Sequence, residues 1–126
     1  MKTVIKTPTA PEAIGPYSQA ILAGNLIFTS GQLPITPASG ALVENDITAQ
    51  TNQAIKNLEA VLLAAGASLS SVVKTSVFIA DMTLFPVVNE VYSKYFAENA
   101  PARSCVEVSA LPKGALIEIE AVAVRQ

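Results

Sequence analysis

The hydrophobic positions of this chain alternate between two spacings, one typical of β-strands and one typical of α-helices. Runs of β-branched residues predict strands at residues 17–23, 26–30 and 71–80 and in two C-terminal stretches. Apolar residues at helical spacing predict helices at 47–65 and 84–98. The predicted order is β-β-α-β-α-β-β, preceded by an extended lead-in over residues 1–16, which are rich in proline and threonine.

Polar residues and breakers mark the ends of both predicted helices. Asp46 is a plausible N-cap of the first helix, and Gly66 is a typical C-terminal stop. Thr83 is placed to cap the second helix, with Pro86 tolerated in its first turn. Two helices inserted between strands favour one β-sheet covered by helices on a single face, an α+β sandwich.

The last strand separates its residues between the two faces of that sheet. Ile117, Ile119, Ala121 and Ala123 suit the helix layer. Leu116, Glu118, Glu120, Val122 and Val124 point the other way. This second set mixes charge with apolar groups, which suits a subunit interface better than open water. Taken alone, the last two strands predict a hairpin around Leu111-Pro112-Lys113-Gly114.

Composition favours a small oligomeric protein over the alternative of a well-packed monomer. Residues 1–126 make a single domain, 51% of the residues are apolar and only 14% are charged, so surplus apolar surface is expected to meet another subunit. The net charge of −2 and the lack of a basic run argue against nucleic-acid binding. The single cysteine, the absence of a signal-peptide pattern and the absence of a long apolar run favour a cytoplasmic location without membrane attachment.

The absence of histidine narrows the possible chemistry. It excludes Ser-His-Asp triads, Cys-His dyads and most zinc sites, and the carboxylates show no metal-ligand spacing. Arg103 and Cys105 remain as candidates because they lie two positions apart on one strand. Arg103 could grip a carboxylate through two parallel hydrogen bonds, or pair with an acid across a subunit boundary. Cys105 could be a nucleophile with a lowered pKa or a small apolar filler.

Four further positions are candidates for a functional or a structural role. Glu118 lies among isoleucines, where a raised pKa would suit proton transfer, or it could pair with a basic residue. Tyr17 could close a small pocket or cover the core edge. Ser30 ends a strand beside Gly31, where a hydroxyl and exposed amides can meet a ligand, whereas Asn89 alone is an ordinary surface residue.

Several motifs together resemble the RidA/YjgF family of reactive enamine/imine deaminases. These are the segments AIGPYSQA, FTSGQLP, VVKTSVFIADM, VNEVY, PARSCVEV and IEIEAVAV, in this order along the whole chain. The resemblance implies a chorismate-mutase-like α+β fold with the final strand inside the sheet. It also implies a homotrimer whose bare sheet faces form a central barrel, with active sites in the clefts between subunits and no cofactor or metal.

The resemblance also implies the roles of individual residues. Arg103 would bind the substrate carboxylate, Glu118 would position or activate water, and the main chain at Cys105 would contact the substrate. The pocket would be lined by Tyr17, Ser30, Gly31 and Asn89. The implied reaction is hydrolysis of 2-iminopropanoate or 2-iminobutanoate, the tautomers of 2-aminoacrylate and 2-aminocrotonate, to 2-oxo acids and ammonia.

Three alternatives remain open on the sequence. The same pocket could bind 2-oxo acids without turnover, as in a regulatory protein. A role as ribonuclease or translation inhibitor is weakened by the acidic charge and the missing histidines. A chorismate mutase would share the fold alone, and a substrate with two carboxylates would need more cations than Arg103 supplies.

Overall fold

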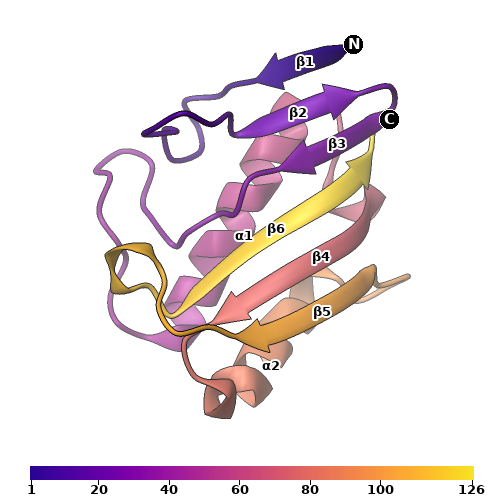
Figure 1. Cartoon of the computed structure of the whole chain (residues 1–126). Helices are drawn as coiled ribbons and strands as arrows, with labels where there is room; N and C mark the ends of the chain where they lie inside the picture. Colours follow the sequence, from indigo (N-terminus) through magenta and orange to yellow (C-terminus); the bar gives the residue numbers. More distant parts are fainter.

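The computed structural model describes residues 1–126 and shows one mixed six-stranded sheet with two α-helices (Figure 1). The strands are β1 Lys2–Ile5, β2 Ala20–Ala23, β3 Leu26–Thr29, β4 Val72–Ile79, β5 Ala102–Glu107 and β6 Ile117–Val124. The helices are α1 Ile47–Ala64 and α2 Phe85–Tyr95. Short 3-10 turns lie at η1 Leu69–Ser71, η2 Met82–Leu84 and η3 Pro112–Gly114. The predicted α+β fold class is confirmed.

The strand order across the sheet is β1-β2-β3-β6-β4-β5. Adjacent strands are antiparallel except β4 and β5, which are parallel and joined through α2. The hairpin predicted around Pro112 is therefore wrong, because β5 and β6 do not pair with each other. β4 lies between them. The position of β6 between β3 and β4, implied by the family resemblance, is confirmed.

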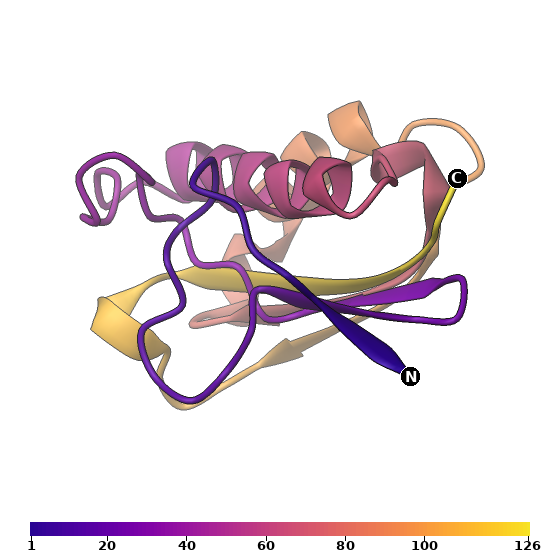
Figure 2. The same ribbon diagram turned by 90° about the horizontal axis from the view of Figure 1, so that it is seen from above.

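Both helices cover the same face of the sheet (Figure 2). The inward residues of β6 are those predicted, since Ile117 and Ile119 have no exposed surface and Ala121 and Ala123 are also buried. They pack in a core of 21 residues that includes the inner face of α1. We call the opposite side of the sheet the open face. It presents partly exposed apolar side chains such as Phe28, at 44% exposure.

The predicted limits of the helices are confirmed for α1 and wrong for α2. The Asp46 carboxylate accepts a hydrogen bond from the N–H of Ala49 at 2.8 Å, and Gly66 has a φ of +85° after the helix. Thr83 does not cap α2. It lies in η2, where its N–H and hydroxyl both donate to Asp81, and α2 ends at Tyr95 rather than at residue 98.

The extended lead-in predicted for residues 1–16 contains a strand that the sequence pattern did not reveal. Residues 2–5 form β1, which pairs antiparallel with β2 at the edge of the sheet. Its side chains are largely exposed, and an exposed strand needs no buried apolar face. The stretch therefore lacks the hydrophobic alternation by which strands are recognised in a sequence. Neither α1 nor α2 combines the length and the hydropathy of a membrane-spanning helix.

Candidate functional site

Arg103 lies on the edge strand β5 and extends over α2. It is in register with Thr75 of β4, which is fully buried beneath the helix layer, so both side chains lie on the helix face of the sheet. Arg103 Nη1 donates to Asn89 Oδ1 at 2.7 Å. Its Cζ atom lies 5.1 Å from the ring centre of Phe85 and 4.8 Å from that of Tyr92. A guanidinium over two aromatic faces is favourably placed for cation–π attraction.

One face of α2 supplies all three of these contacts. Phe85, Asn89 and Tyr92 occupy positions i, i+4 and i+7, which coincide on a helix surface. Sequence reasoning found Asn89 through the family resemblance and did not connect Phe85 or Tyr92 with Arg103. The signal that could have identified the contacts of Arg103 is the helical spacing of two aromatic residues and one amide before a strand that carries an arginine.

The contacts of Arg103 leave its charge available to a ligand. Its partner Asn89 is a neutral amide, so this hydrogen bond does not compensate the positive charge. Arginine carries several N–H donors in a rigid fork, and the bond to Asn89 uses one of its two terminal nitrogens. The arrangement is suited to a small anionic group, above all a carboxylate.

Cys105 also points to the helix face, in register with the buried Val77. The free thiol is half-buried. Burial raises the pKa of Cys105, although the nearby charge of Arg103 acts in the opposite direction. The thiol therefore stays protonated near neutral pH, which favours the filler interpretation over the nucleophile. As the edge strand, β5 leaves one row of backbone N–H and C=O groups unpaired within the sheet, available for a ligand.

Glu118 lies on β6 and points to the open face of the sheet. Its strand neighbours Ile117 and Ile119 point inward, and its register partner is Phe78. The carboxylate is half-buried, and burial together with the negative charge of Glu120 raises the pKa of Glu118 above the usual range. A carboxyl group of this kind can exchange protons closer to neutral pH than an exposed glutamate.

The backbone at Gly31 passes directly beneath the Glu118 carboxylate. A Cβ atom at this position would lie 2.5 Å from Glu118 Oε2 and 2.7 Å from its carboxyl carbon, both closer than real contacts. Glycine is therefore required for the observed position of Glu118.

Gly31→Ala is expected to displace the Glu118 side chain rather than unfold the protein. The atoms met by the new methyl group are the far end of a flexible side chain, which can move at low cost. Any activity that depends on the Glu118 carboxylate should fall, while the unfolding midpoint changes by a few degrees at most, roughly the effect of 1 kcal/mol or less. Kinetics and thermal unfolding of the same preparation check this. A variant with full activity would contradict it.

Ser30, which follows β3, is hydrogen-bonded to the segment that carries Tyr17. The Ser30 N–H donates to the carbonyl of Gln19 at 2.9 Å, and the hydroxyl donates to the carbonyl of Ser18. The hydroxyl proton predicted to meet a ligand is thus used inside the chain, although its oxygen can still accept. The neighbouring Tyr17 is 52% exposed. The roles of Ser30 and Tyr17 as pocket residues stay predictions.

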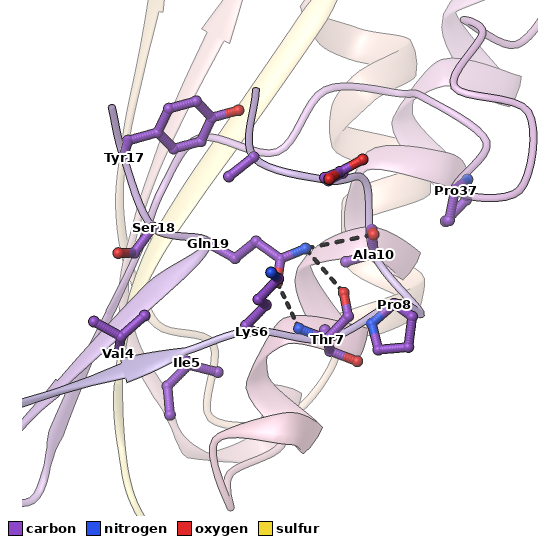
Figure 3. A pocket seen from close by; sticks show the side chains of 12 residues that line it. Val4, Ile5, Lys6, Thr7, Pro8, Ala10, Tyr17, Ser18, Gln19 and Pro37 are labelled. Carbon is purple, nitrogen blue, oxygen red and sulfur yellow. Dashed lines mark hydrogen bonds between the residues drawn. The ribbon is translucent and has the colours of Figure 1, made fainter. Parts of the chain in front are cut away.

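A cavity of about 630 Å³ lies beside Tyr17, between β1 and the loop that follows it (Figure 3). The buried Gln19 side chain braces this loop, accepting from the N–H of Thr7 and donating to the carbonyls of Thr7, Ala10 and Pro11. Tyr17 lines the cavity, but neither Arg103 nor Glu118 does. It is therefore a pocket of the N-terminal segment and not the place where the predicted catalytic groups meet.

The predicted site residues form two half-sites. The arginine half-site comprises Arg103, Asn89 and Cys105 on the helix face of β5 and α2. The glutamate half-site comprises Glu118 and Gly31, with Ser30 beside them, on β6 and the end of β3. β4 separates their strands, and the two half-sites face opposite sides of the sheet. One chain does not bring them together.

Comparison with known proteins identifies the family. Residues 7–125 match the family model described as Endoribonuclease L-PSP. The chain belongs to this family, also known as YjgF/RidA. The curated "RutC family protein" from Pyrococcus horikoshii is 55% identical over 126 residues, all of both chains. Human "2-iminobutanoate/2-iminopropanoate deaminase" is 50% identical over 125 residues, covering 99% of this chain and 91% of the human one.

Solved structures of YjgF/RidA members share the fold closely. E. coli TdcF with bound serine superimposes with a TM-score of 0.94 at 43% identity, covering 98% of this chain and 99% of TdcF. The names given to members of the family refer to an endoribonuclease, to a deaminase, to a translation initiation inhibitor or to no activity. Family membership therefore fixes the fold, and the choice among activities depends on the two half-sites.

Proposed function

We propose that this protein hydrolyses 2-iminopropanoate and 2-iminobutanoate, reached from 2-aminoacrylate and 2-aminocrotonate, to 2-oxo acids and ammonia in the cytoplasm. The observation that carries the proposal is Arg103, a guanidinium with an uncompensated charge, fixed by Asn89 and two aromatic rings on a rigid strand. It fits a substrate with one carboxylate. The human relative at 50% identity bears the name of this activity, and a related structure holds serine, a small molecule with one carboxylate.

The complete site is proposed to form between copies of the chain in a homotrimer. Arg103 and Glu118 lie on opposite faces of the sheet, so a substrate held by one can reach the other only if a second copy supplies it. The open face offers an apolar surface for this contact, with Phe28 at 44% and Val106 at 46% exposure. Barrel packing of three open faces would bring the edge strand of one copy to the Glu118 region of the next.

Within that site, each half contributes one part of the reaction. Arg103 of one copy binds the carboxylate and sets the C=N carbon in place. Glu118 of the other copy accepts a proton from water. At the same time the water oxygen bonds to that carbon, and the C=N π electrons move to nitrogen. Glu118 returns that proton to the nitrogen and then transfers the hydroxyl proton to the same nitrogen as the C–N bond breaks, so that ammonia leaves and the hydroxyl becomes the 2-oxo group.

The size of the catalytic effect required is modest. General acid–base catalysis contributes typically about 10²–10⁴-fold, which one carboxyl group with a raised pKa can supply. The chain residues perform every proton transfer in this scheme, and no step requires a metal or an organic cofactor. A ribonuclease, by contrast, would benefit from a basic surface, and the net charge is −2 with no histidine in the chain.

The test is a coupled assay with semicarbazide. A threonine dehydratase generates 2-aminocrotonate, and semicarbazide traps the derived imine as a semicarbazone. Substoichiometric wild-type protein is expected to suppress semicarbazone formation, because hydrolysis removes the imine first. If trapping is unaffected while 2-oxobutanoate still binds, the deaminase proposal is wrong and the site is that of a non-catalytic 2-oxo-acid-binding regulatory protein.

A further inference from the structure

A hydrogen bond between two buried hydroxyl groups lies directly behind Arg103. Tyr92 of α2 and Thr75 of β4 share a contact of 2.7 Å between their oxygens. Thr75 has no exposed surface and Tyr92 has 5%. The bond joins the helix layer to the sheet at the register position of Arg103 on the next strand.

This bond fixes the orientation of the Tyr92 ring. A buried hydroxyl left without a partner costs roughly 1–3 kcal/mol, so each hydroxyl holds the other in place. The ring is also packed against Phe96, with centroids 4.6 Å apart. Burial raises the pKa of Tyr92, so the hydroxyl remains protonated and the bond persists through neutral pH.

The fixed ring in turn restricts the guanidinium above it. Arginine has a long side chain that loses considerable rotamer freedom when it binds a ligand, and prior restriction reduces that loss. The Cζ atom of Arg103 lies 4.8 Å from the centre of the Tyr92 ring, while Asn89 holds one terminal nitrogen. Rotation of the ring would remove the surface on which the guanidinium rests.

We propose that Tyr92 and Thr75 are positioning residues for Arg103. Their shared hydrogen bond sets the ring so that the arginine fork is held ready for a carboxylate before the ligand arrives. The inference rests on the proposed function only in taking a small carboxylate as the ligand. It assigns a functional role to two buried residues that touch no substrate.

The test is direct titration of the intact assembly with 2-oxobutanoate by calorimetry, together with kinetics. Tyr92→Phe keeps the ring and removes its bond to Thr75. Its Kd for 2-oxobutanoate and its KM for the imine should rise about three- to tenfold with kcat nearly unchanged, since ground-state and transition-state binding are lost together. Thr75→Val should give the same change. The double variant should bind 2-oxobutanoate no more weakly than either single variant, because the same hydrogen bond is lost in all three. Thr75→Ser, which keeps the hydroxyl, should restore affinity.

Tyr95→Phe is the matched control. Tyr95 lies on the same helix, and its hydroxyl donates a bond of the same length, 2.7 Å, to Asn52 rather than to a residue at Arg103. Wild-type affinity in Tyr92→Phe and Thr75→Val, or an equal loss in Tyr95→Phe, would overturn the inference. So would a wild-type protein that does not bind 2-oxobutanoate at all. Arginine-dependent binding without imine hydrolysis would defeat the proposed function alone, and the same titrations would still decide the positioning role.

Discussion

Arg103→Ala is expected to lower kcat/KM for 2-iminobutanoate by about 10²–10³-fold, the value of two charge-assisted hydrogen bonds. The guanidinium is held by the neutral Asn89 and by two rings, so its removal leaves no buried charge without a partner. The proposed trimer and the thermal stability of the protein should persist. The coupled assay and size-exclusion chromatography measure the two properties on one preparation.

Arg125→Ala is the control for this change. It removes the same charge from an exposed position beside Gly66 at the far end of β6, and it should retain full activity. Arg103→Lys should recover little, because an ammonium group lacks the planar fork and the ring stacking of arginine. An Arg103→Ala protein that hydrolyses the imine at the wild-type rate would refute the carboxylate clamp.

Glu118→Gln should lower kcat by about 10²–10⁴-fold with little change in KM, because the amide cannot exchange protons with water or the leaving nitrogen. The substitution preserves shape, so the close contact with Gly31 is retained. Single-turnover kinetics at saturating substrate separate the chemical step from binding. A variant with wild-type kcat would show that Glu118 is not the proton-transfer group.

The pH profile gives a second test of Glu118. Water activation requires its ionised form, and burial and Glu120 raise the pKa of Glu118. Activity should therefore decline on acidification at a higher pH than for an exposed glutamate. Glu120→Gln removes the repulsive charge, so it should keep most activity and move the acidic limb to lower pH. An acidic limb unchanged by Glu120→Gln would assign the titration to another group.

The elements of this fold could be predicted because they depend on local patterns. Asp46 and Gly66 limit α1 through capping and backbone geometry, and the alternation along β6 gives its buried face correctly. Strand pairing is non-local, and the pattern around Pro112 could not show that β4 lies between β5 and β6. β1 escaped recognition because its exposed side chains carry no alternation.

The candidate site could be predicted as a set of residues but not as a geometry. The strand positions of Arg103 and Glu118 already indicated these two residues, and motif resemblance added Asn89. The sequence could not show that Arg103 and Glu118 face opposite sides of one sheet. The support from Phe85 and Thr75 was also missed, since buried aromatic and hydroxyl residues on regular elements are usually core residues. Their relation to Arg103 depends on the parallel pairing of β4 and β5.

Mixing two inactive variants tests the central claim, that each active site takes Arg103 from one copy and Glu118 from another. Arg103→Ala and Glu118→Gln proteins are co-refolded in equal amounts, and native mass spectrometry verifies that mixed trimers form. About a quarter of the wild-type activity should return, because random mixing pairs an intact Arg103 with an intact Glu118 at one interface in four. Mixed trimers that remain inactive would contradict the shared site.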